Sequence, residues 1–133
     1  MKLSITKDEL NKYISNQINN YFPDSDAVLP GKISHYLEDA MDRLYFCFKH
    51  IKRKYYYENG KPIFNHLNSD HYSMFLYFLS NTVYEKDKNE TLAAKLFLLN
   101  KALHAVDAFY KIALPQIFIF IHPVGTVIGN AKY

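Results

Sequence analysis

Histidines with nearby carboxylates are the first places in this sequence where chemistry could occur. His35, Glu38, Asp39 and Asp42 stand at positions i, i+3, i+4 and i+7 of a predicted helix. Three of them could share one helix face and ligate a metal ion, because imidazole and carboxylate are common metal ligands. The simpler interpretation is a charged face exposed to water. We therefore expect no metal site.

A second cluster lies in the sequence NHLNSDH, where His66 and His71 stand close to Asp70. A carboxylate can orient an imidazole for proton transfer, although loop histidines beside a helix cap are the more common arrangement. His104 stands beside an apolar stripe and is interpreted as a histidine of the core or of an interface. The sequence contains no Gly-rich phosphate loop, no Ser nucleophile elbow and no HExxH motif.

A basic stretch followed by tyrosines, KHIKRKYYY, occupies residues 49–57. Lys49, Lys52, Arg53 and Lys54 could contact phosphates of single-stranded nucleic acid while the tyrosines stack on its bases. Cations near a helix C-terminus also interact favourably with the helix dipole, which is the simpler explanation. We therefore expect no nucleic-acid binding and keep it as the alternative.

The composition limits the number of domains and excludes several kinds of site. The 133 residues suffice for one compact domain, and the net charge of +3 is too small to indicate nucleic acid by itself. Cys47 is the only cysteine, which excludes an intramolecular disulfide and a cysteine-based zinc site. The N-terminus lacks the apolar core of a signal peptide, and residues 112–131, although uncharged, are interrupted by prolines and glycines. A cytoplasmic protein without a membrane span is expected.

The elements that must position these residues are four predicted helices. Thr6 and Glu9 form a capping-box pattern before the first helix, and Asn89 precedes the longest apolar repeat, with leucines at steps of four and three. Pro115 forbids continuation of that repeat, so the fourth helix is expected to end near Ala113. The predicted helices cover about residues 6–22, 33–52, 70–84 and 90–113.

Two stretches break the helical period. Asn59-Gly60 is a strong turn signal within KRKYYYENGKPIF, where a short hairpin and a plain loop are both compatible with the sequence. After Pro115, the β-branched and aromatic residues 116–121 favour extended chain. The sequence therefore predicts helices followed by a change of architecture.

The final stretch, IHPVGTVIGNAKY, carries an aliphatic residue followed by glycine at Ile128-Gly129. Aliphatic-Gly-x-x-small hexads build left-handed parallel β-helices. With LHAVDAFYKIAL at residues 103–114 and FIHPVGTVIG at residues 120–129, the chain resembles the serine acetyltransferase family of hexapeptide-repeat acyltransferases. The matching residues are His104, Ala105 and Ala108 in the first segment, and Ile121, His122, Pro123, Ile128 and Gly129 in the second.

The resemblance implies an enzyme that moves an acetyl group from acetyl-CoA to the hydroxyl of serine or of a sugar. A histidine acts as general base in that family, and the resemblance places it in the coil after Tyr133. The family's aspartate before Ile-His-Pro is Phe120 here, and one extra residue separates His122-Pro123 from Ile128-Gly129. The catalytic residue is therefore unassigned, with His122 and His104 as the candidates within this chain.

The sequence thus predicts a mainly α fold, with a multi-helix N-terminal domain (residues 1–114) and a short extended segment that begins a left-handed parallel β-helix (residues 115–133). The expected function is that of a helical assembly domain in an acetyl-CoA-dependent O-acyltransferase, binding no cofactor itself. We expect a homo-oligomer, trimer-based through the β-helix, and a chain that is a fragment or truncated form. The alternative is a stand-alone helical interaction module, with nucleic acid as the partner of residues 49–57.

Overall fold

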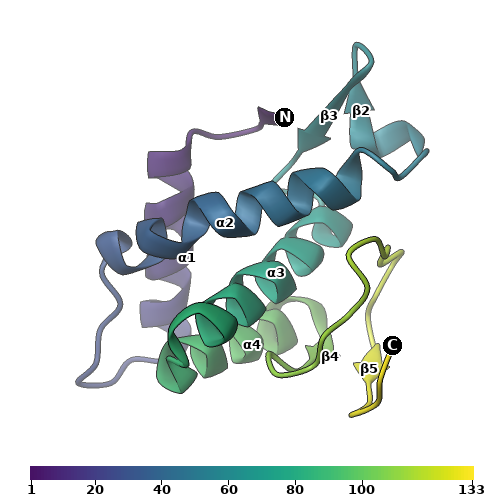
Figure 1. Ribbon diagram of the computed structural model, residues 1–133. Coiled ribbons are helices and arrows are strands. Elements are labelled where there is room, and N and C mark those ends of the chain that lie inside the picture. The colour runs from purple at the N-terminus through teal and green to yellow at the C-terminus, as the bar shows by residue number, and fades with distance from the viewer.

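The computed structural model describes all 133 residues and is mainly helical, as predicted (Figure 1). Strands of two to four residues lie at the margins of the helices. The helices are α1 (Lys7–Tyr21), α2 (Pro30–Phe48), α3 (Ser69–Asp87) and α4 (Glu90–His104). The strands are β1 (Lys2–Leu3), β2 (Tyr57–Glu58), β3 (Lys61–Phe64), β4 (Asp107–Ala108) and β5 (Val127–Ile128), and a 3-10 turn covers Lys54–Tyr56.

Side-chain caps begin three of the four helices. The predicted capping box is present: Thr6 Oγ1 accepts the Glu9 N–H at 3.1 Å, and Glu9 Oε1 accepts the Thr6 N–H at 3.3 Å. The Asn68 and Asn89 side chains cap α3 and α4 by accepting backbone N–H groups of the first turn, without a reciprocal bond. Pro30 opens α2, where its missing N–H costs no hydrogen bond. These beginnings follow from local sequence because a cap uses only neighbouring residues.

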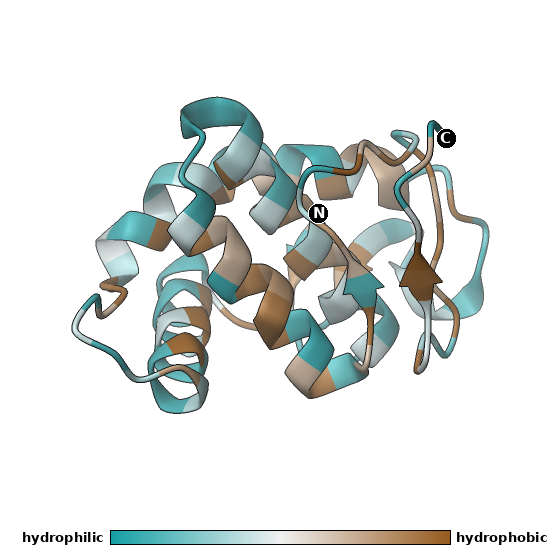
Figure 2. Ribbon diagram, turned by 90° about the horizontal axis from the view of Figure 1, so that it is seen from below, coloured by the Kyte–Doolittle hydropathy of each residue, from teal (hydrophilic) through white to brown (hydrophobic).

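Helix α3 lies at the centre of the molecule, packed against α2 and α4 (Figure 1). Every residue from 71 to 83 is buried, so the helix has no polar stripe. Around it the other helices turn apolar stripes inward and polar residues outward (Figure 2). Lys95 of α4 is also buried, and it binds Asp24 Oδ1 at 2.8 Å and the Asp26 carbonyl at 2.7 Å. This pair of contacts ties α4 to the loop between α1 and α2.

Residues 57–64 form a hairpin, which is one of the two alternatives compatible with the sequence. Asn59 and Gly60 have φ of 50° and 76°, as the two-residue turn of such a hairpin requires. Strand β3 pairs antiparallel with β2 and parallel with β1, so the strand order is β1-β3-β2. The N-terminus is thereby joined to the middle of the chain.

Several helix boundaries differ from the prediction: α2 begins at Pro30 and not near Ile33, and α3 ends at Asp87 and not near Tyr84. Two helix ends differ the most. Helix α2 ends at Phe48 and not near Lys52, and α4 ends at His104 and not near Ala113. Ala105 adopts φ 52°, a left-handed conformation that stops α4. The apolar repeat continues past this point because Val106 and Tyr110 are also buried, although from non-helical chain. Residues 116–121, expected to be extended, form no strand.

Hydrogen bonds fasten the chain after α4 to the central helix. Tyr77 Oη donates to the Ile112 carbonyl at 2.6 Å and accepts the Leu114 N–H at 2.9 Å. Asn81 Nδ2 donates to the Tyr110 carbonyl at 2.8 Å. Buried Cys47 of α2 donates its thiol hydrogen to the Phe118 carbonyl at 3.1 Å. The segment therefore lies on the helical core through buried polar contacts as well as apolar ones.

The last strand, β5, pairs in parallel with β4, in the register Asp107 to Val127 and Ala108 to Ile128. Both strands lie beside the C-terminus, where β5 appears strongly hydrophobic (Figure 2). No turn of a left-handed β-helix is formed by these residues. None of the four helices combines the length and the apolar character that crossing a membrane requires.

Candidate functional site

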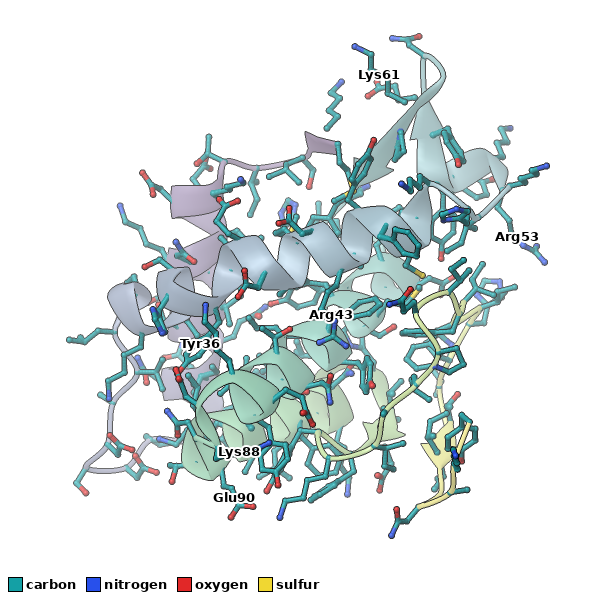
Figure 3. The ribbon with its side chains drawn as sticks, viewed as in Figure 1. Tyr36, Arg43, Arg53, Lys61, Lys88 and Glu90 are labelled. Atoms are coloured by element: carbon teal, nitrogen blue, oxygen red, sulfur yellow. The ribbon has the colours of Figure 1, made fainter.

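A cleft of about 510 Å³ lies where the N-terminus of α3 meets the loop after α2 and the C-terminal segment. Its walls combine one cation, one anion, one imidazole and several neutral polar groups. Arg53 extends from the loop after α2 at the margin of the molecule (Figure 3). The lining residues with polar side chains are Arg53, Tyr55, Tyr56, Asn65, Asn68, Ser69, Asp70 and His122.

His122 is held in this cleft by its backbone. Its φ is 47°, and its N–H donates to Asp70 Oδ1 at 3.0 Å. The imidazole is exposed and takes part in none of the hydrogen bonds of the molecule. Asp70 therefore fixes the chain at His122 but does not orient the ring. A general base needs such an orienting partner, so the cleft by itself contains no complete catalytic pair.

The two histidines near Asp70 in the sequence, His66 and His71, make structural contacts. His71 is completely buried, its Nδ1 accepts the Asn65 N–H at 3.1 Å, and its ring packs against Phe48 and Tyr56. Burial lowers its pKa from 6.5 to about 4, so the ring is neutral at pH 7. His66 is bonded to Ser4 Oγ at 2.7 Å. The pairing of Asp70 with an imidazole, weighed from the sequence, is not formed.

His104, the other candidate, lies at the end of α4, half-buried with its ring edge toward Tyr72. Its Nδ1 lies 2.8 Å from Asn100 Oδ1, and the Asn100 amide nitrogen donates to the Ser73 carbonyl. Since Oδ1 can only accept, the proton of the neutral ring is on Nδ1 and the basic nitrogen is Nε2. Burial lowers the pKa of His104. No hydrogen bond joins it to His122.

Three of the four residues weighed as metal ligands have separate partners, and the fourth, Asp42, forms no ion pair. His35 Nε2 lies 3.2 Å from Asp87 Oδ2, Glu38 binds Lys7, and Asp39 binds Lys86. The Tyr36 hydroxyl donates to the same Asp87 oxygen and, as the largest cause, lowers the pKa of that carboxyl. No group of three or more His, Cys, Asp or Glu side chains in the molecule is arranged to hold a metal ion.

The basic stretch offers few free rings for stacking. Tyr56 is buried, and the Tyr57 hydroxyl donates to the Lys49 carbonyl at 2.8 Å. Tyr55 is 72% exposed, with the Lys54 ammonium 5.7 Å from its ring centre. One tyrosine of the three therefore projects freely into solvent, which is a weak platform for a single-stranded nucleic acid.

Apolar residues of the C-terminal segment surround a second hollow, of about 540 Å³. Phe120, which stands where the family pattern has aspartate, is buried and packs on Phe118 with ring centres 5.0 Å apart. Ile121 and Tyr133 line the hollow and remain partly exposed. This surface is apolar and has no charged group among its lining residues.

Sequence reasoning missed the cleft as a unit. It singled out Asp70, His122 and Arg53 separately, but the first two are 52 residues apart and meet only through tertiary packing. No local pattern signals that contact. Comparison with known proteins adds no assignment: no protein-family model, no curated protein and no solved structure matches this chain.

Proposed function

We propose that this chain is the helical assembly domain of an acetyl-CoA-dependent O-acyltransferase, similar to serine acetyltransferases, with serine or a sugar hydroxyl as the acceptor. The observation that carries the proposal is the parallel pairing of β5 on β4. The paired residues are 20 apart in the sequence, and the chain between them contains no helix. Parallel strands are usually joined through a helix, whereas stacked solenoid coils pair in parallel without one.

The sequence of β5 supports the same proposal. Ile128 is the aliphatic residue of the aliphatic-Gly pair Ile128-Gly129, and it is half-buried while Val127 is 73% exposed. Strand β5 pairs on one side only, so its outer backbone groups form an open edge. A further coil could pair with this open edge and cover the neighbouring apolar hollow. Both the unpaired backbone groups and the apolar side chains would then be removed from water.

In the proposed reaction a histidine takes the proton of the acceptor hydroxyl. The oxygen attacks the thioester carbonyl of acetyl-CoA, and CoA leaves as the thiol after receiving a proton. We assign that histidine to a coil stacked beyond β5, because neither His122 nor His104 has an oriented carboxylate partner. The helices of this chain pack protomers together in a trimer-based homo-oligomer.

The test is an acetyl-transfer assay, monitored by release of the CoA thiol, with serine and neutral sugars as the hydroxyl acceptors. Residues 1–133 are expected to give no turnover above background, and a chain that continues into further hexads is expected to be active. Loss of activity on replacing a histidine of those coils completes the assignment. Turnover by residues 1–133 that is abolished by His122→Ala would contradict the assignment of the base, and an inactive gene product without hexads would contradict the proposal.

A further inference from the structure

A third hollow, of about 300 Å³, lies between α2, α3 and the chain after α4, away from the cleft at Arg53. Its volume is at the low end for ligand sites, which favours a small molecule. Figure 3 shows Arg43 in the space between α2 and α3. The lining consists of one acid, one base, two aromatic rings, a leucine and an amide: Asp42, Arg43, Phe46, Phe78, Leu114 and Gln116.

Arg43 is held in a fixed position by neutral groups alone. Nη1 donates to Thr82 Oγ1 and Nη2 to Asn81 Oδ1, each at 2.8 Å, and the guanidinium carbon lies 5.0 Å from the centre of the Phe78 ring. None of the ion pairs of the molecule includes Arg43. The half-buried guanidinium therefore lacks a carboxylate partner, while retaining N–H groups free to donate.

The environment of Arg43 disfavours leaving its charge unpaired. Burial is the main cause that lowers the pKa of Arg43, and Tyr77 and Glu85 act in the opposite direction without forming an ion pair with it. Partial burial of a charge costs free energy, which hydrogen bonds or an opposite charge can offset. A ligand carboxylate would supply this compensation through a charge-assisted hydrogen bond.

Asp42, the neighbouring residue on α2, lines the same hollow and also has no ion-pair partner. A ligand with a carboxylate alone would meet this negative charge as well as the guanidinium. A ligand carrying both charges would satisfy both residues. Phe46, Phe78 and Leu114 would then contact an apolar body.

We propose that this hollow binds a free amino acid with an aromatic side chain, with its carboxylate on Arg43, its ammonium on Asp42 and its side chain against Phe46, Phe78 and Leu114. The site lies between α2, α3 and the chain after α4, and it does not depend on the proposed transferase activity. It gives the helical domain a ligand of its own.

The test is calorimetric titration of residues 1–133 with L-phenylalanine, compared with 3-phenylpropionate and phenethylamine, which lack the ammonium and the carboxylate. Each lost charge pair is expected to weaken binding by about tenfold or more. Amide resonances of Phe46, Phe78 and Gln116 should shift on titration, and those around Arg53 should not. No binding of L-phenylalanine, or shifts confined to the Arg53 cleft, would overturn the proposal.

Variants separate the two charges. Asp42→Asn changes an exposed residue and should remove the preference for L-phenylalanine over 3-phenylpropionate while the fold is retained. Arg43→Lys keeps a charge but loses the planar fork, and binding should fall by about tenfold. Arg53→Lys, the matched change in the other cleft, should leave binding unaltered. Equal binding of L-phenylalanine and 3-phenylpropionate by the unaltered protein would exclude the role of Asp42.

Discussion

His71 is an ionisable residue placed entirely inside the core. Its ring lies between Phe48, Tyr56 and Phe64, and its Nε2 has no hydrogen-bond partner. Because Nδ1 accepts the Asn65 N–H, the proton of the neutral ring is on Nε2. Protonation of Nδ1 would break that bond and place a charge among aromatic rings, which is why the folded pKa is as low as about 4.

This shift makes stability depend on pH. The unfolded state binds a proton to His71 near pH 6.5 and the folded state near pH 4, so stability is complete above pH 6.5 and falls as the pH drops toward 4. His71→Gln should lose this pH dependence, amounting to on the order of 3 kcal/mol over that interval. Chemical denaturation at several pH values measures it.

The matched variant His50→Gln replaces an exposed histidine and should keep the slope of the unaltered protein. His104, whose pKa is also lowered by burial, adds to the slope in both variants equally. A His71→Gln protein with an unchanged pH dependence would show that His71 is accessible to protons in the folded state.

The candidate site could be predicted only as separate residues. Asp70 was identified from its neighbours His66 and His71, yet its partner is the N–H of His122. Likewise, Asp42 was weighed for its position on a helix face, and its proximity to Phe78 and Leu114 depends on how α3 and the C-terminal segment pack. Side chains from different elements meet through tertiary structure, which residue spacing does not encode.

At the scale of elements, helix beginnings were predicted better than helix ends. Thr6 and Asn89 cap helices through residues three positions away, so the signal is local. The end of α4 has no such signal: Ala105 is an ordinary helix former, and Pro115 stands ten residues later. The turn there is stabilised from elsewhere, since the Ala105 carbonyl accepts the Gly125 N–H at 3.0 Å. A distant strand pair thus outweighs local helix propensity.

Ala105 is therefore a site where glycine should stabilise the protein. Its φ of 52° is strained for a residue with a Cβ and natural for glycine. Ala105→Gly should raise the free energy of unfolding by roughly 0.5–1 kcal/mol, a gain partly reduced by the greater freedom of the unfolded chain. Thermal unfolding of the variant measures this change.

The control is Ala102→Gly, three residues earlier on the exposed side of α4. Glycine within a helix is unfavourable, so this variant should lose about 1 kcal/mol. If the two Ala→Gly substitutions change the free energy of unfolding in opposite directions, the left-handed end of the helix lies at Ala105. Destabilisation of both variants to the same extent would mean that α4 continues through Ala105 in solution.

At the scale of the whole molecule, one core joins the helices to the C-terminal segment. Buried residues from all four helices form a single cluster that also includes Val106, Ala108, Tyr110 and Phe120. Several exposed apolar side chains lie outside this core at the end of the chain, where Val124 and Val127 are more than 70% exposed. Such a surface beside an open strand edge is a site of association.

We expect residues 1–133 to associate at micromolar concentration through this surface. Val127→Lys should weaken association by about tenfold or more, because a charged side chain on an edge strand opposes pairing. Leu29→Lys changes a similarly exposed residue at the start of α2, away from the C-terminus, and should have no effect. Sedimentation velocity measures both, and a monomer in the unaltered protein at these concentrations would contradict the expectation.

The contact between Cys47 and Phe118 has a further consequence. The only thiol of the molecule is fully buried beneath the C-terminal segment, where it donates to the Phe118 carbonyl, and burial raises its pKa. Reaction with an alkylating reagent requires the thiolate and therefore requires the segment to lift. The rate at which Cys47 is alkylated therefore reports how often the segment around Phe118 opens, and no cysteine has to be introduced to measure it.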